Sequence, residues 1–436
     1  MLSFAGRLTL IKSVLDSLPG YYLSLFKLPK GVVKEIDKWR ATFLWGSSEI
    51  RRKIHLVNWK LVTLSKEHGG LGIRRVRDCN DFLLTKWWWR YGVEDESLWK
   101  KVILNKYGGV GGRWIPVMEG TGKESLVWSD ILSVLRENAE RFEFFTSNCK
   151  LVIGNGCRIH FWHDKWLSNV QLKVEFPRLF RLSVDKEGNL SSFMQRRDIS
   201  GNWRLLFTRS LLAWEEEEVQ RLQDLTGAAP RINEELPDSV RWTASPSGHF
   251  TVASMRKWYE ETQGPKMQVP NLLWRGVAPP KAQFLSWLAW RGRVKTISLL
   301  QRFRALSSNV ENLCLFCKLE PESVDHLFLQ CTEIWKVWSS LLQWWGVSWV
   351  IPATVDGVLL WWMGTKFKKS VLRIWRLAPI AMLWSVWRLR NECVFKGNQP
   401  NMEELGEIVK VRVGLWAKSG QPGFQYSVHD VVANLN

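Results

Sequence analysis

Four residues in the last third of the chain have the types and spacing of a metal site: Cys314, Cys317, His326 and Cys331, in the pattern C-x2-C-x8-H-x4-C. Three thiolates and one imidazole fill all four positions of a tetrahedral zinc ion, which is typical of structural rather than catalytic zinc. Because His326 and Cys331 are little more than one helical turn apart, we expect them to converge from the start of a helix. The alternative is chance, since one C-x2-C pair is not rare among seven cysteines.

No other group of residues has the spacing of a catalytic or metal site. His160 and His163, with Asp164 and Cys157 close by in the sequence, could supply metal ligands. Their spacing is poor, however, and the aromatic residues beside them favour a packed strand end. We interpret the acidic run Glu215–Glu218 as the solvated surface of a helix.

The positive charge of the chain is concentrated in stretches without acids. The formal net charge is +19, and no Asp or Glu occurs between Glu261 and Glu311 or between Asp356 and Glu392. Basic stripes attract phosphate, so we expect RNA or DNA as a partner, with a solvated basic face as the alternative. The expected nucleic-acid-binding residues are Lys281, Arg291, Arg293, Lys295, Arg302 and Arg304.

The zinc loop itself is acidic, which argues against direct contact with phosphates. We therefore expect the metal to clamp this loop while the basic segment before it, at about 281–305, contacts the nucleic acid. The acids around the loop are Glu311, Glu320, Glu322, Asp325 and Glu333.

Length and periodicity predict a mainly α protein with a smaller mixed α+β middle region. We divide the 436 residues into a helical module at 1–110, a turn-rich middle at 111–264, a small zinc-stabilised helical module at 265–345 and a Trp-rich helical tail at 346–436. Most of the 29 tryptophans have helical spacing and are expected in the core.

Local signals predict several helices and strands. One helix should end at Pro19, a second should begin after Pro29 with Val32, Ile36, Trp39 and Phe43 on its apolar face, and Asn80 should cap a third. Strands are expected at 150–153, 158–162 and 249–252, the first two joined as a hairpin by Gly154-Asn155-Gly156.

Two observations bear on the compartment. Residues 337–365 are apolar, but Pro352 and Asp356 interrupt them, so we expect two packed helices rather than a membrane span. The cysteines outside the zinc pattern are scattered and no secretory signal is evident, which favours the nucleus or cytoplasm. We expect neither a membrane nor a small-molecule partner.

Several short motifs occur along the chain in a fixed order. They are L-S-F-A-G-R-L-T-L-I-K from residue 2, F-L-W-G at 43–46, G-G-L-G-I at 69–73, I-G-N-G-x-x-I-x-F-W-x-D-x-W at 153–166, P-K-A-Q-F-L-S-W at 280–287 and W-x-x-W-x-x-R-N-x-x-V-F at 384–395. In this order they resemble the C-terminal portion of plant non-LTR (LINE-type) retrotransposon reverse transcriptases. The part from Phe250 through Trp338 resembles their reverse-transcriptase zinc-binding domain, and the similarity extends to about residue 420.

The resemblance implies one structural Zn²⁺ on the Cys3His residues, a thumb-like role for 1–110 and a C-terminal part that holds element RNA or target DNA. The family's polymerase uses paired aspartates for two metal ions, and no two aspartates are adjacent in this chain. Some relatives also carry a ribonuclease H domain; here Glu403, Glu404 and Glu407 are expected to form a helix surface rather than a nuclease centre.

We therefore expect a non-catalytic, zinc- and nucleic-acid-binding remnant of a reverse transcriptase rather than an enzyme. A separate reverse-transcriptase core is a further candidate partner. Two alternatives remain open: a decayed retrotransposon fragment without selected function, and a protein-interaction module that uses the Trp-rich tail.

Overall fold

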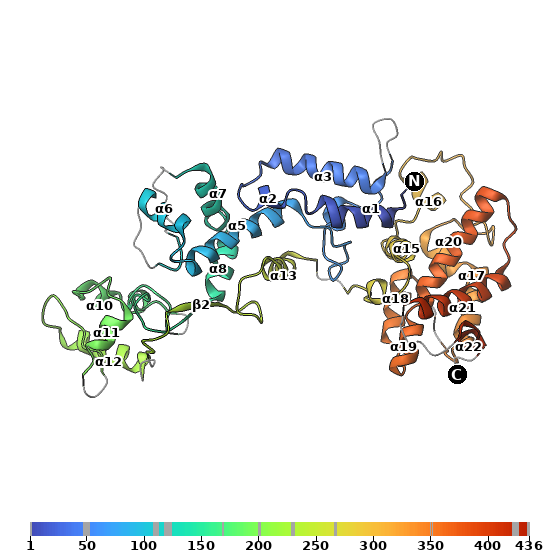
Figure 1. The fold of residues 1–436 in the computed structure, drawn as a ribbon. Helices are drawn as coiled ribbons and strands as arrows, with labels where there is room; N and C mark the ends of the chain where they lie inside the picture. Colours follow the sequence, from blue (N-terminus) through green and yellow to red (C-terminus); the bar gives the residue numbers. More distant parts are fainter. Residues whose placement is uncertain are drawn as a thin grey trace. The chain divides into compact units, whose positions relative to one another are not determined.

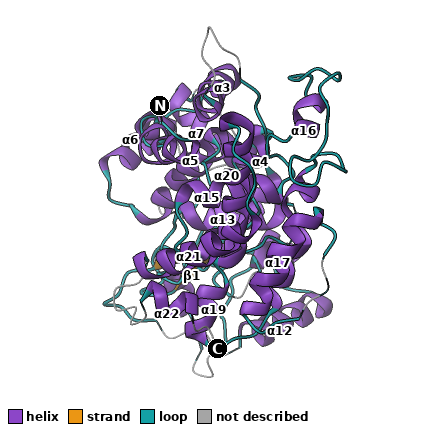
Figure 2. Cartoon of the chain, turned by 90° about the vertical axis from the view of Figure 1, so that its right-hand side faces the viewer, coloured by secondary structure: helices purple, strands orange, loops and turns teal. Residues whose placement is uncertain are grey.

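The computed structural model describes residues 2–46, 53–107, 113–116, 124–167, 170–198, 202–227, 232–265, 268–348, 350, 352–420 and 427–433. Within these residues the fold is mainly helical and contains one two-stranded sheet (Figures 1 and 2). The expected class, mainly α with a small β contribution, is confirmed.

The chain divides into two compact units, each of which combines stretches that are far apart in the sequence. Unit 1 comprises Met1–Leu18, Lys34–Arg75 and Gln263–Asn436, and unit 2 comprises Pro19–Val33 and Val76–Thr262. The four consecutive segments expected from the sequence stay a prediction.

Unit 1 contains the C-terminal helices together with the N-terminal ones. Its elements, including most of α3, are α1 (Phe4–Leu10), the π-helix η1 (Ile11–Leu15), α3 (Lys30–Trp45), α4 (Trp59–Val62), α14 (Leu272–Arg275), α15 (Pro280–Trp290), α16 (Ile297–Arg302), the π-helix η2 (His326–Gln330), α17 (Thr332–Trp344), α18 (Val355–Gly364), α19 (Lys369–Trp375), α20 (Ala378–Lys396), α21 (Met402–Ser419) and α22 (Val428–Ala433).

Tryptophans dominate the core of unit 1, as their helical spacing predicts. Trp362 and Trp375 stack with ring centroids 4.1 Å apart, and each indole N–H donates to the backbone carbonyl of the other residue. Both side chains are fully buried, with their polar atoms satisfied, so they act as core residues. Trp45, Trp287 and Trp338 are fully buried in the same core.

Helix α3 begins after Pro29 as expected, but its buried face is offset by one residue. Val33, Ala41 and Leu44 are buried, whereas Trp39, which we expected on the apolar face, is 67% exposed. The buried Arg40 explains the offset, because its guanidinium pairs with Asp16 and donates to the Arg74 carbonyl. Polar partners therefore set the orientation of this helix.

The apolar stretch 337–365 forms two helices, α17 and α18, as predicted. None of the helices in the described ranges combines the length and the apolar character that crossing a membrane requires.

Unit 2 contains both helices and the two-stranded sheet. Its elements are α2 (Gly20–Leu23), α5 (Val76–Val93), α6 (Leu98–Tyr107), α7 (Leu126–Arg136), α8 (Ala139–Asn148), β1 (Cys149–Val152), α9 (Leu172–Glu175), α10 (Pro177–Leu182), α11 (Leu190–Gln195), α12 (Ala213–Thr226), β2 (Ser239–Trp242) and most of α13 (Val252–Gln263).

The predicted hairpin is wrong, although its first strand exists. Strand β1 pairs antiparallel with the distant β2, with Cys149 opposite Trp242. Of the expected second strand, only His160 forms an isolated bridge, with Asn189, and helix α13 begins at Val252, where we expected a third strand.

A buried carboxylate explains why the chain does not fold back after β1. Asp238 Oδ1 accepts hydrogen bonds from the amides of Gly154 and Gly156, at 2.7 and 2.9 Å, and Oδ2 accepts from Arg158 and Ile159. The Gly154-Asn155-Gly156 turn therefore wraps around the residue that precedes β2, and β2 takes the place of the expected partner strand.

Asn80 is not a helix cap, because α5 already begins at Val76. Its side chain is buried within α5, where Nδ2 donates to the carbonyls of Leu23 and Phe26 and Oδ1 accepts from the Leu28 amide. Asn80 therefore fixes the segment after α2 within unit 2.

Candidate metal centre

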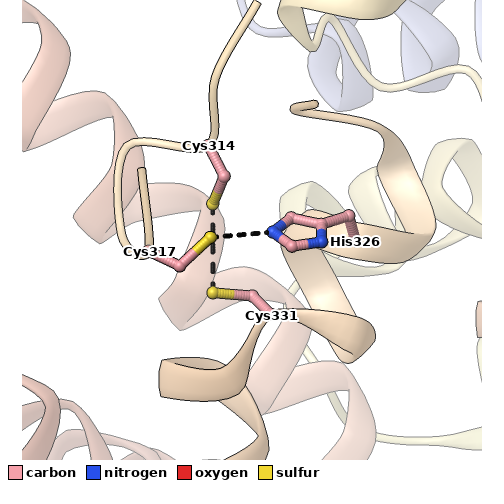
Figure 3. A group of neighbouring side chains, drawn as sticks. All are labelled: Cys314, Cys317, His326 and Cys331. Carbon is pink, nitrogen blue, oxygen red and sulfur yellow. Dashed lines mark hydrogen bonds between the residues drawn. The ribbon is translucent and has the colours of Figure 1, made fainter. Parts of the chain in front are cut away.

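The four sequence-predicted ligands lie together in unit 1 (Figure 3). All of their potential ligand atoms are within 4.8 Å of one another. Cys314 Sγ is 3.9 Å from Cys331 Sγ, and Cys317 Sγ is 3.3 Å from His326 Nε2. Within the described residues, no other His, Cys, Asp and Glu side chains form such a group.

These distances match the edges of a zinc tetrahedron. Zn–S and Zn–N bonds of ~2.3 and ~2.0 Å imply sulfur–sulfur edges of ~3.8 Å and sulfur–nitrogen edges of ~3.5 Å. Cys314, Cys331 and His326 are buried and Cys317 is half-buried. The cluster can hold one zinc ion with four side-chain ligands, which is the arrangement of a structural site.

The first two ligands lie on a tight turn. The Cys314 amide donates to the Glu320 carbonyl at 2.7 Å, and the Lys318 amide donates to the Cys314 carbonyl at 2.8 Å. Lys318 adopts a positive φ of 58°, which is uncommon for a residue with a side chain and closes the turn. This backbone places both sulfur atoms on the same side of the loop.

The other two ligands belong to a π-turn: His326 is the first residue of the π-helix η2, and Cys331 follows its last residue. The Cys331 amide donates to the His326 carbonyl at 2.9 Å, the five-residue hydrogen bond that defines a π-turn, and α17 begins only at Thr332. The sequence predicted the convergence of His326 and Cys331, but the wider turn is what brings residues five apart onto one side.

The thiols are arranged to supply a thiolate. The Cys314 Sγ–H group donates to Cys331 Sγ, and this hydrogen bond holds the pKa of Cys331 below its ordinary value. Zinc binds thiolates, so the arrangement suits the metal.

Three of the five acids around the loop have partners, and one of them, Glu333, pairs with Lys336 at 2.9 Å. Glu322 is fully buried and forms an ion pair with Arg390 of α20, and Asp325 accepts a hydrogen bond from the Val355 amide at 2.8 Å. Glu311 and Glu320 are exposed. Sequence proximity could not reveal Arg390, which is 68 residues from Glu322.

The six basic candidates all belong to unit 1. Lys281 and Lys295 line the same cavity in unit 1, together with Arg388. Arg302 and Arg304 are exposed at the end of α16. Contact between nucleic acid and any of the six residues stays a prediction.

Arg291 and Arg293 have partners within unit 1. The Arg291 guanidinium donates to the Gly69 carbonyl at 2.6 Å and lies over the Trp290 ring, and burial lowers its pKa. Arg293 lies over the Phe303 ring at 5.9 Å. Arg291 thus has a clear structural role, because it holds the Gly69-Gly70 turn.

The structure gives the surroundings of the acidic run Glu215–Glu218 and of the histidines His160 and His163. Glu215 is not a solvated residue of the acidic run: it is buried, and it pairs with Arg178 and Arg209. Each of the two histidines lies beside a carboxylate. His160 Nδ1 is 3.4 Å from Asp164 Oδ2, and His163 Nε2 is 3.0 Å from Glu187 Oε1.

Similarity to known proteins supports the metal assignment. Residues 250–338 match the family described as zinc-binding in reverse transcriptase, and this range contains all four ligands. The chain is related to plant retrotransposon reverse transcriptases. The family match starts before and ends before the module we expected at 265–345.

Two curated relatives come from Arabidopsis thaliana. One, provisionally named as a ribonuclease H protein, is 30% identical over 399 residues, which cover 83% of this chain and 59% of that protein. An uncharacterised mitochondrial protein is 29% identical over 152 residues, which cover 35% of this chain and 93% of that protein. The chain thus spans about three fifths of the relative that carries the ribonuclease H name.

Proposed function

We propose that this chain binds RNA or DNA through basic residues of unit 1 and that one zinc ion has a structural role in that binding. The observation that carries the proposal is a hydrogen bond of 3.0 Å from the Ile297 amide to Glu322 Oε1. It joins the first residue of α16 to the zinc loop, so the metal fixes the start of the helix whose far end carries Arg302 and Arg304.

Further contacts between the same two segments support this role for zinc. The Asn312 side-chain amide donates to Ser298 Oγ at 2.9 Å, and Asn312 Oδ1 accepts from the Glu322 amide at 3.2 Å. With its start held twice, α16 presents its basic end in a constant orientation. Lysine and arginine side chains held in this way can neutralise phosphates and release their counterions.

The proposal describes a binding protein without catalysis. We propose, on the absence of adjacent aspartates in the sequence, that polymerisation is left to a separate reverse-transcriptase core. We further propose that the protein acts in the nucleus or cytoplasm. The proposal includes the division of the chain into modules at 1–110, 111–264, 265–345 and 346–436.

The test uses the full chain. We expect one zinc per chain by elemental analysis, and an affinity for RNA and DNA oligonucleotides that falls steeply as salt rises. Replacing Arg293, Arg302 and Arg304 together with glutamine should flatten the slope of log affinity against log salt by about 2 for a single strand.

The matched control removes the same charge from unit 2. Lys101, Arg221 and Lys257 are exposed and form surface ion pairs there, so their replacement by glutamine should leave the slope unchanged. Zinc without nucleic-acid binding would contradict the proposal and favour a decayed fragment. Binding of a protein partner that is insensitive to salt would favour an interaction module.

A further inference from the structure

A cavity of about 370 Å³ opens within unit 1, in the range typical of small-ligand sites. Its lining comes from the start of α1, from Leu56, from α15 with Val294 and Lys295 after it, and from α20. Helix α15 packs against both α1 and α20 in the unit (Figure 1). Segments distant in sequence therefore build one site.

The walls of the cavity are aromatic and aliphatic. Phe4 stacks on Phe284 with centroids 5.5 Å apart and an interplanar angle of 13°, and Trp384 and Trp387 line α20's side. Both tryptophans are only half-buried. Flat aromatic faces of this kind favour a planar, apolar guest.

The polar groups of the lining are cationic. Lys281, Lys295 and Arg388 are in contact with the cavity, and no carboxylate is among the described residues that line it. Lys281 is exposed, and Arg388 shares its charge with Glu392 at 3.0 Å on the same helix. Asn391 adds a side-chain amide, a group that can hydrogen-bond the edge of a base.

The metal centre supports one wall of the cavity. The ring of Phe328, from the π-helix between two zinc ligands, lies 6.5 Å from the Trp387 ring. Arg390, the partner of Glu322, lies over the same Trp387 ring at 5.3 Å. Trp387 is therefore held by residues whose own positions depend on the zinc loop.

We propose that this cavity takes a single unpaired nucleobase of an RNA or DNA strand, with the flanking phosphates on Lys281, Lys295 and Arg388. The inference rests on the proposed nucleic-acid binding and names its ligand. An apolar aromatic cavity surrounded by cations is complementary to a flat base carried on a polyanion. In a duplex the base faces are stacked, so the site selects single strands.

The experiment measures binding of the full chain to four labelled oligonucleotides over a salt series from low to moderate concentration. They are a single-stranded RNA, the DNA of the same sequence, its duplex, and the single-stranded DNA with abasic sites at its centre. We expect the single strands to bind more tightly than the duplex, and the abasic strand to bind about 5- to 100-fold more weakly than the intact one. The RNA and DNA arms identify which strand the site prefers.

Three variants locate the effect. Trp384→Ala should remove the difference between intact and abasic strands, whereas Trp384→Phe should retain part of it. Replacing Lys281, Lys295 and Arg388 with glutamine should weaken binding of all strands and lower the salt slope by about 2, with the unit 2 triple variant as the control of equal charge.

If Trp384→Ala fails to fold, crosslinking of the wild-type chain tests the same site. A strand containing 4-thiouridine should crosslink on irradiation to Phe4, Trp384 or Trp387, as identified by mass spectrometry. Equal, salt-sensitive binding of intact, abasic and duplex DNA, with crosslinks elsewhere, would overturn the base site and leave the proposed function in place. Absence of all binding at low salt would overturn both.

Discussion

Glu322 and Arg390 form a buried ion pair that ties the zinc loop to α20. Arg390 Nη2 lies 2.8 Å from Glu322 Oε1 and Nε lies 3.1 Å from Oε2, so the contact is bidentate. The Glu322 side chain is fully buried and that of Arg390 is 7% exposed. Because both groups are almost completely shielded from water, each depends on the other to stabilise its charge.

Removing one partner of this pair should cost more than removing both. Arg390→Met leaves the Glu322 charge buried without its partner, and we expect a loss of about 3–5 kcal/mol in the free energy of unfolding. The double variant Glu322→Gln/Arg390→Met keeps an acceptor for the Ile297 amide and should recover part of the loss. Denaturant unfolding of the two single variants and the double variant measures the coupling. Losses that simply add would contradict the pair's importance.

Loss of a zinc ligand should release the metal and loosen unit 1. We expect Cys314→Ser to contain less than one zinc per chain and to melt at a lower temperature, because zinc binding contributes directly to folding free energy. Elemental analysis and thermal melting measure both. Cys157→Ser, at an exposed cysteine of unit 2, is the matched control; identical behaviour of the two variants would refute the metal assignment.

Asp238 should be essential for the turn after β1. In Asp238→Asn one oxygen becomes an NH₂ group that faces amide donors, so two of the four hydrogen bonds are lost. Since bonds to a charged acceptor contribute about 1.5–3 kcal/mol each, we expect a loss of roughly 3 kcal/mol or more. Chemical denaturation gives the value. Asp224→Asn, on the exposed surface of α12, should change stability little.

Glu215 should make stability depend on pH in the acid range. Its hydrogen bond from Arg209 is the main reason that its pKa falls from 4.5 to about 2. A lowered pKa in the folded state means that the stabilisation is complete above about pH 4.5 and disappears as the pH falls towards 2. Melting temperatures over this range should fall more for the wild type than for Glu215→Gln. Parallel curves for the two proteins would exclude the contribution.

The metal ligands could be predicted from the sequence because all four lie within one short segment, where spacing alone limits the geometry. The π-turn between His326 and Cys331 agrees with that spacing but could not be distinguished from a helix start. Helical periodicity similarly located α3 but not its orientation, which depends on the pairing of Arg40 with Asp16.

The errors share a physical cause, namely polar side chains with distant partners. Asn80, Asp238 and Glu215 each have the local appearance of a cap, a loop residue or a solvated acid. Each is in fact buried, because backbone amides, carbonyls or arginines from elsewhere in the chain satisfy it. Such partners depend on the tertiary fold, and short-range patterns contain no information about them.

The interleaved composition of the two units has a consequence for synthesis on the ribosome. Residues 1–18 and 34–75 leave the ribosome early, but the last part of their unit begins only at Gln263, a delay of about 10 to 40 s at typical elongation rates. During that interval Leu71 and Ile73, which are fully buried in the finished protein, have no core to join. Unit 2 can fold first, while the N-terminal part of unit 1 exposes apolar side chains to which chaperones can bind.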